Sequence, residues 1–196
     1  MSNKHVIIAH YNEDLTWTKN LMYPYTIISK QNLAKEVAPN KGNEASSYLE
    51  YIITNYEKLP DICIFVHGHR NDWHHKQNID EKINSLNYCH NYYNINELCL
   101  NQLESLKNAP ISLDALNKYI NIFNDILNTT IIVENLKYRA CAQFYVSKKN
   151  ILNNSKEQYN KLYTFLMTTN IPSYWSGRFF EYLWHYIFTH EHEDTL

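Results

Sequence analysis

Apolar residues are arranged along this chain in short continuous runs that alternate with helical stripes. Three runs rich in β-branched or aromatic residues, at 6–10, 25–29 and 62–66, predict strands. Between the last two, apolar residues recur every three to four positions and predict a helix over 44–56 with one apolar face. Because a continuous apolar run is typical of a strand covered on both faces, the strands are expected to form a buried parallel sheet.

The rest of the chain continues this alternation without internal repeats or linkers rich in Pro, Gly or Ser. The further predicted elements are helices at 15–21, 112–127, 155–168 and 176–189, and strands at 131–133 and 142–146. Weak periodicity at about 76–110 predicts an irregular insertion with loop and short helix. Strands alternating with helices predict a single α/β domain over 1–196, with a mostly parallel central sheet and helices on both faces.

Composition and charge restrict the partners. The formal net charge of -2 provides no bulk positive field for nucleic acid or an anionic membrane. The sequence has no signal peptide and no apolar run of ~18 residues, so we expect a cytoplasmic protein (host cytoplasm for a viral one), neither secreted nor inserted in a membrane.

The 17 Tyr and only 3 Gly are typical of AT-rich coding sequence, such as that of large DNA viruses. The 4 Cys lack CxxC spacing, which favours reduced thiols.

The first candidate site is a histidine cluster. Four of the 10 histidines lie within residues 67–75, directly after the strand at 62–66. Ligands of open α/β sheets bind outside the carboxyl ends of strands. His67 and His69 are two apart on extended backbone and point the same way, so they could share a metal ion, a phosphate or a hydroxyl. The alternative is a polar loop whose histidines bond to backbone.

Two helix segments carry further candidates. Lys41 and Gly42 precede the helix at 44–56, where free N–H groups favour an anion, although an ordinary capped helix start explains them equally well. Glu181 and His185 are four apart and share a helical face, with Arg178 a turn earlier. They suit a general base with a metal or hydroxyl contact, or alternatively an aromatic core helix with a surface ion pair.

Two observations complete the set of candidates. The acid-rich run at 10–14 ends the first strand, and its side chains could hold a ribose or base or simply cap a helix. All three glycines, Gly42, Gly68 and Gly177, fall in the candidate segments. In a chain this poor in glycine, that coincidence favours a site that needs close approach of the backbone.

These segments resemble an uncharacterised family, a domain of unknown function found in fungal, bacterial and viral proteins. The matching stretches are His10-Tyr11-Asn12-Glu13-Asp14, Asn40-Lys41-Gly42-x-Glu44-Ala45, His67-x-His69-Arg70-x-x-Trp73-His74, Cys141-Ala142-Gln143-Phe144 and Ser176-Gly177-Arg178-x-x-Glu181-Tyr182-x-Trp184-His185. They extend over most of the chain, in a specific order and spacing. This chain has Asn43 where the family usually has Arg, which weakens any argument for charge at that helix start.

The layout is more distantly similar to nucleotide-sugar glycosyltransferases of the GT-A fold, which is Rossmann-like. In those enzymes a D-x-D motif after a buried strand binds Mn²⁺ or Mg²⁺ and the diphosphate, and here His67-Gly68-His69 stands in its place. The roles implied by the resemblance are catalytic for Glu181, metal or diphosphate binding for His67, His69 and His185, donor binding for Asn12, Glu13, Asp14, Lys41, Gly42, Glu44, Arg70 and Arg178, and the acceptor side for Trp73, His74, Gln143 and Trp184. Neutral His is a poorer ligand than carboxylate for a hard cation, so a requirement for metal stays open.

The resemblance therefore implies transfer of a sugar from a nucleotide-sugar to a glycan or other hydroxyl acceptor. Two alternatives stay open, a His-rich metal-dependent hydrolase and a non-catalytic glycan-binding module. The enzymatic hypotheses share one geometric expectation, which is that His67, His69 and Glu181 border the same cleft.

Overall fold

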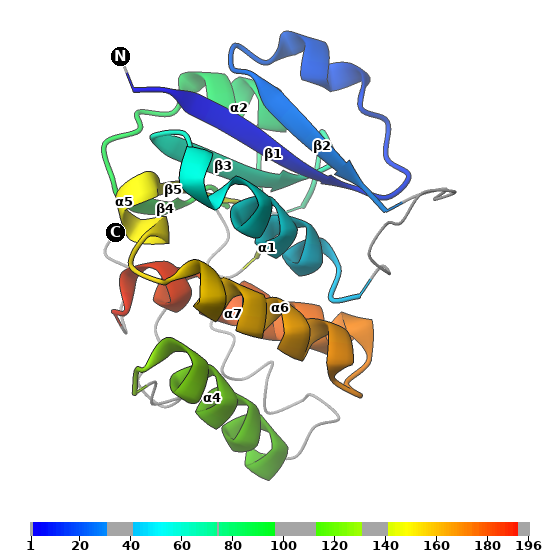
Figure 1. Cartoon of the computed structure of the whole chain (residues 1–196). Helices are drawn as coiled ribbons and strands as arrows, with labels where there is room; N and C mark the ends of the chain where they lie inside the picture. The colour runs from blue at the N-terminus through cyan, green and yellow to red at the C-terminus, as the bar shows by residue number, and fades with distance from the viewer. Residues whose placement is uncertain (1, 31–40, 74, 97–112, 131–140, 192–196) are drawn as a thin grey trace.

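A computed structural model describes residues 2–30, 41–73, 75–96, 113–130 and 141–191. Five strands form one mixed sheet in the order β2-β1-β3-β5-β4 (Figure 1). The strands are β1 (Lys4–His10), β2 (Tyr25–Ser29), β3 (Ile62–His67), β4 (Tyr92–Asn94) and β5 (Phe144–Ser147). β1 pairs in parallel with β2 and β3, whereas β5 is antiparallel to both β3 and β4. The predicted α/β fold is confirmed, and the sheet is parallel only on one side of β5.

Helices cover both faces of this sheet. They are η1 (Thr16–Asn20), α1 (Glu44–Asn55), η2 (Tyr56–Lys58), α2 (Ile79–Ser85), α4 (Leu113–Leu127), α5 (Lys148–Ile151), α6 (Lys156–Thr168) and α7 (Ser173–Thr189). One hydrophobic cluster joins the sheet to α1, α6 and α7, and a second joins its other face to η1 and α2. α4 packs on α6, on the side away from the sheet (Figure 1).

The strand β1 illustrates why the apolar runs are continuous. Ile7 belongs to the cluster on the α1 side, while Val6 and Ile8 belong to the cluster on the α2 side. All three are fully buried. Because successive side chains of a strand point to opposite faces, a strand covered on both sides requires apolar residues at every position.

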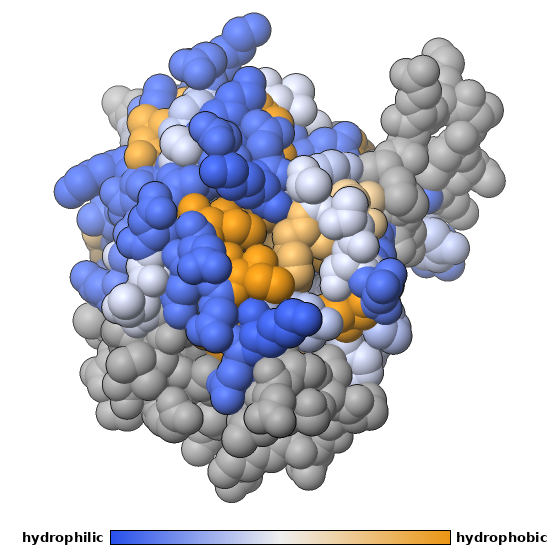
Figure 2. Space-filling model, turned by 60° about the horizontal axis from the view of Figure 1, so that its bottom comes forward, coloured by the Kyte–Doolittle hydropathy of each residue, from blue (hydrophilic) through white to orange (hydrophobic). Residues whose placement is uncertain are grey.

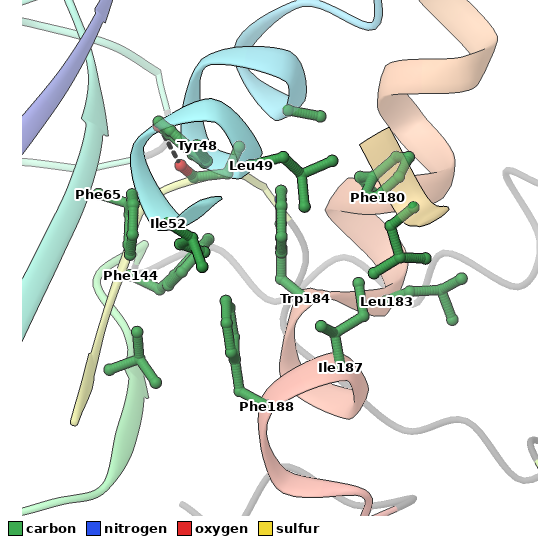
Figure 3. Packing of buried hydrophobic residues seen from close by; sticks show 14 of the residues in the cluster. Tyr48, Leu49, Ile52, Phe65, Phe144, Phe180, Leu183, Trp184, Ile187 and Phe188 are labelled. Carbon is green, nitrogen blue, oxygen red and sulfur yellow. Dashed lines mark hydrogen bonds between the residues drawn. The ribbon is translucent and has the colours of Figure 1, made fainter. Parts of the chain in front are cut away.

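Aromatic side chains fill the space between α1, the sheet and α7 (Figure 3). Trp184 lies in this core with 1% exposure, and its ring stacks on Phe188 at 5.6 Å between centroids. The Tyr48 hydroxyl donates a buried hydrogen bond to the Ala142 carbonyl at 2.8 Å. The structure therefore places Trp184 inside the core, and not on an acceptor-facing surface as the resemblance implied.

Other differences from the expected elements are local. The helix expected at 15–21 is the 3₁₀ turn η1, and the last helix begins earlier than expected, at Ser173. The region predicted as irregular contains α2 and also the strand β4, which the sequence pattern did not predict. The strand expected at 131–133 lies outside the described residues.

Within the described ranges, the helices are too short or too polar to cross a bilayer. On the face turned forward in Figure 2, hydrophilic residues predominate and hydrophobic residues gather in a central group.

Candidate active site

A cavity of about 320 Å³ lies at the carboxyl ends of β1 and β3, beside the start of α1. The described residues that line it are Ala9, His10, Tyr11, Glu13, Lys30, Asn43, Glu44, Ser47, His67, His69 and Asp72. Adjacent parallel strands end at the same edge of a sheet, which brings the loops after β1 and β3 together. Four of the predicted site residues, Glu13, Glu44, His67 and His69, therefore meet in one cavity.

Three of these side chains could hold a metal ion. Donor atoms of His67, His69 and Asp72 all lie within 4.8 Å of one another. The His67 Nε2 and Asp72 Oδ2 atoms are 3.2 Å apart. Two ligands on one ion, with bonds of about 2.1 Å, stand roughly 3.0–3.4 Å apart. This pair fits a shared ion, and His69, whose side chain is 57% exposed, has room to rotate toward it.

Glu13 adds a negative charge beside this group. Its Oε1 atom is 3.8 Å from His69 Nδ1, and its Oε2 atom accepts hydrogen bonds from the backbone N–H groups of Tyr11 at 2.8 Å and Asn12 at 3.2 Å. Burial opposes the ionisation of Glu13. The backbone hydrogen bonds and the nearby imidazoles outweigh burial and lower its pKa. Glu13 is therefore an ionised carboxylate at neutral pH.

The loops after β1 and β3 are held together by Gly68. Its carbonyl accepts a buried hydrogen bond from Trp17 Nε1 at 2.8 Å. A Cβ at position 68 would lie only 2.7 Å from Glu13 Oε2 and 3.0 Å from Glu13 Cβ. The two loops therefore approach closely at Gly68, and a larger residue there would require the Glu13 side chain to move.

A pair of carboxyl groups joins the cavity to α7. Glu44 is the first residue of α1, and burial together with the nearby charge of Glu181 raises its pKa to about 8. Burial also raises the pKa of Glu181, against the opposing effect of Arg178. Two carboxyls that each disfavour the other's charge retain a proton between them at neutral pH.

Close packing of two glycines explains why these carboxyls are neighbours. Gly42 begins the turn into α1 with a φ of +68°, and Gly177 lies one turn before Glu181 in α7. A Cβ on Gly177 would lie 2.9 Å from the Gly42 carbonyl oxygen. Only a glycine lets α7 approach the start of α1 this closely, and the approach brings Glu181 toward Glu44. Glu181 therefore adjoins the cavity through Glu44, although it is not among the described residues that line it.

Two predicted phosphate-binding cations are engaged elsewhere. The Lys41 ammonium donates hydrogen bonds to the carbonyls of Thr169, at 2.9 Å, and Ile171, just after α6. The Arg70 guanidinium makes two hydrogen bonds of 3.1 Å to the carboxylate of Asp80, which is 1% exposed. Neither side chain lines the cavity in the described structure.

The remaining predicted donor-binding side chains also have local roles. Asp14 is exposed and accepts hydrogen bonds of 2.9 Å from both the backbone N–H and the hydroxyl of Thr16, which lower its pKa. These contacts are local to the turn that precedes η1. The Arg178 guanidinium stacks over the ring of Tyr174 at 4.4 Å. Asn12 is exposed, and its backbone N–H belongs to the Glu13 network already described.

The structure does not bring His185 to the histidine pair. His185 lines a second, polar cavity of about 510 Å³ beside β4 and α5, and its ring lies 5.3 Å from that of Tyr92. Its Nε2 atom is hydrogen-bonded to the hydroxyl of Thr189 at 3.2 Å. The predicted third ligand is therefore in a different place, and Asp72 is the residue that accompanies His67 and His69.

Of the predicted acceptor-side residues, Trp73 alone is seen on the surface within the described structure. It is 62% exposed and directly follows Asp72. Gln143 is fully buried and donates a hydrogen bond from Nε2 to Asn96 Oδ1 at 3.2 Å. His74 lies outside the described residues.

Asp72, Lys30 and Ser47 are among the cavity residues that were not predicted as site residues. Asp72 stands in the same loop as the histidines, three positions after His69. Lys30 directly follows β2, so its position at the end of a parallel strand was a usable signal. Ser47 lies one turn into α1, and nothing in the sequence distinguishes it from the neighbouring Ser46.

Comparisons with known proteins give one match. A family model described as "Protein of unknown function (DUF3431)" matches residues 6–195. No curated protein and no solved structure matches the chain. All the cavity residues lie within the matched range.

Proposed function

Since the chain belongs to the DUF3431 family, which is described as proteins of unknown function, we propose its activity from the cavity: transfer of a sugar from a nucleotide-sugar to a hydroxyl acceptor. The observation that carries the proposal is the composition of the cavity. It joins the metal-compatible group of His67, His69 and Asp72 to Glu44, the neighbour of Glu181. Sugar transfer requires both a group that neutralises a leaving diphosphate and a group that accepts a proton.

The order of the elements supports the same proposal. A first strand with a polar end, a glycine-bearing helix start, a buried strand followed by His-x-His, and a late helix with a carboxylate correspond to β1, α1, β3 and α7. This is the order that the resemblance to GT-A glycosyltransferases implies.

The metal, when bound, would be held by His67, His69 and Asp72 and would supply positive charge to the diphosphate oxygens. Asp72 provides a carboxylate that the His-x-His motif lacks. Two imidazoles with one carboxylate favour Mn²⁺ or Zn²⁺ over Mg²⁺, because imidazole suits softer ions.

The carboxyl pair of Glu44 and Glu181 accepts the proton of the acceptor hydroxyl. The acceptor oxygen attacks the anomeric carbon, a C–O bond forms, and the bond from that carbon to the diphosphate oxygen breaks with its electron pair leaving on the diphosphate. The acceptor proton passes to the Glu44–Glu181 pair, in which Glu44 lines the cavity and Glu181 lies behind it. Burial raises the pKa of both carboxyls, and Arg178 opposes this effect at Glu181, so the pair shares the proton. General-base catalysis of this kind contributes about 10²–10⁴-fold.

Trp73 is proposed to contact the acceptor. Its indole is 62% exposed and adjoins Asp72. An exposed aromatic face can pack against the apolar face of a sugar ring while the sugar hydroxyls stay hydrated.

A metal-dependent hydrolase is a second candidate, favoured by the His67-His69-Asp72 group alone. Three ligands leave further positions on an ion for water, which a metal can activate as a nucleophile. In that case water replaces the acceptor hydroxyl.

The test combines a panel of uridine and guanosine diphosphate sugars with Mn²⁺. One donor should raise the melting temperature, and release of its diphosphate should require a hydroxyl acceptor. Glu181→Gln should lower turnover by about 10²-fold or more with the fold retained, while Glu157→Gln, an exposed glutamate on α6, should not change it. Absence of any donor-dependent shift or turnover would refute the proposal, and release that needs only water would favour hydrolysis.

A further inference from the structure

Lys30 and Ser47 line the cavity but have no part in the transfer step. We propose that they form an oxyanion subsite that takes one phosphoryl group of the diphosphate. The identity of the ligand as a diphosphate rests on the proposed function. The subsite itself rests on the geometry of these two residues.

Lys30 is a buried cation at the end of β2. Its side chain is 3% exposed, and its backbone N–H donates to the His10 carbonyl at 2.9 Å, which fixes it beside the end of β1. Its Nζ atom donates to Glu50 Oε2 at 3.2 Å, and the Glu50 side chain is 42% exposed. Burial of an ammonium group is costly unless it is paired well. Among the described residues, one partly solvated carboxylate accepts one of the three ammonium donors, which pairs this charge incompletely.

Ser47 presents a buried hydroxyl to the same cavity. The residue is 1% exposed, and within the described part of the chain its Oγ atom has no hydrogen-bond partner. Ser47 precedes Glu50 by three positions and therefore lies on the same face of α1. The Lys30 ammonium, held at Glu50, is thus next to the Ser47 turn. A buried hydroxyl normally has a partner, so the arrangement points to a ligand.

The hydrogen-bond donors of Lys30 and Ser47 suit an oxyanion. An ammonium and a hydroxyl both donate hydrogen bonds to an oxyanion. Glu44 stands at the start of α1, and its raised pKa keeps that carboxyl protonated and uncharged at neutral pH. A phosphoryl group and a sugar carboxylate share the required chemistry, and the diphosphate of the donor supplies the former.

The experiment measures binding of inorganic pyrophosphate to the full chain by calorimetry in EDTA, so that no metal contributes. Lys30→Met should weaken binding by about 10- to 100-fold, as expected for loss of a charge-assisted hydrogen bond. Ser47→Ala should weaken it several-fold and leave the melting temperature of the ligand-free protein unchanged or higher, because it removes an unpaired hydroxyl. Lys161→Met, an exposed lysine on α6, is the matched control and should bind as the wild type does.

The outcomes separate the subsite from the proposed function. Wild-type affinity in both the Lys30 and Ser47 variants would overturn the subsite even if the protein transfers sugar. Binding that depends on both residues in a protein that turns over no nucleotide-sugar would support the subsite and count against the transfer. Binding of glucuronate but not of pyrophosphate would overturn the phosphoryl assignment.

Discussion

Replacement of Gly177 by alanine tests the contact that brings Glu181 to the cavity. In an ordinary helix interior this change stabilises the folded state by roughly 0.5–1 kcal/mol. Here the new Cβ would lie 2.9 Å from the Gly42 carbonyl oxygen and 3.0 Å from its carbonyl carbon. These are backbone atoms, which cannot rotate away, so α7 or the start of α1 must move.

The expected effect is therefore opposite in sign to the helix propensity. Overpacking costs about 1–3 kcal/mol, which leaves a net loss of up to about 2.5 kcal/mol in the free energy of unfolding once the propensity gain of roughly 0.5–1 kcal/mol is subtracted. For a chain of this size, each kcal/mol corresponds to roughly 2–4 °C in melting temperature. Urea denaturation of the wild type and the variant measures the difference directly.

The control is Asn160→Ala, an exposed position in the middle of α6, where a smaller gain in propensity should appear without a clash, offset only by loss of an exposed hydrogen bond to the Lys156 carbonyl. Gly177→Ala should also lower turnover, because the displaced helix carries Glu181. If Gly177→Ala is as stable as the wild type or more stable, the close approach of α7 to Gly42 is refuted. The physical basis for the carboxyl pair is then lost with it.

Three further predictions concern the cavity. His67→Ala and Asp72→Ala should each abolish the rise in melting temperature that Mn²⁺ or Zn²⁺ produces, because each removes one of three ligands. Glu44→Gln should become progressively more stable than the wild type as the pH rises from about 4.5 to about 8. The reason is that the folded wild type binds a proton there that the unfolded chain has released, so its stability falls as the pH rises. Trp17→Phe should cost about 1–3 kcal/mol in a chemical denaturation experiment, because it leaves the buried Gly68 carbonyl unpaired.

Each of these three predictions would be contradicted by a specific result. A metal-dependent shift that survives in both ligand variants would exclude that site as the source of the shift. A Glu44→Gln variant whose stability parallels that of the wild type at every pH would show that Glu44 is not held protonated. A Trp17→Phe variant with wild-type stability and metal affinity would show that this hydrogen bond does not hold the histidine loop.

The parts of the fold that the sequence predicts are those whose pattern is set by burial on two sides. β1 and β3 read as continuous apolar runs because helices cover both faces of the sheet there. β4 is a short edge strand of only 3 residues, Tyr92–Asn94, and such a pattern does not distinguish a strand from a loop. The antiparallel direction of β5 was also not predicted, because an apolar run is the same whichever way it is paired.

The site was predicted where position along a strand determines it. His67 and His69 follow a buried strand, and the structure brings them to the expected edge of the sheet. Lys41 was assigned to an anion from its charge and its place before a helix start, but it donates to a carbonyl 128 residues away, at Thr169, which no local pattern reveals. The hydrogen bonds from Arg70 to Asp80 were not predicted either, since Asp80 becomes a buried neighbour only through folding.

The place of β5 in the sheet has a consequence for synthesis of the protein. β5 is the last of the five strands in the chain, yet it lies between β3 and β4. Until residues 144–147 emerge from the ribosome, one side of the apolar strand Ile62–His67 lacks its pairing partner, and Tyr92–Asn94 has no strand to join. A nascent chain or a truncated product that ends before this point would carry an open, apolar sheet edge, which is a template for aggregation.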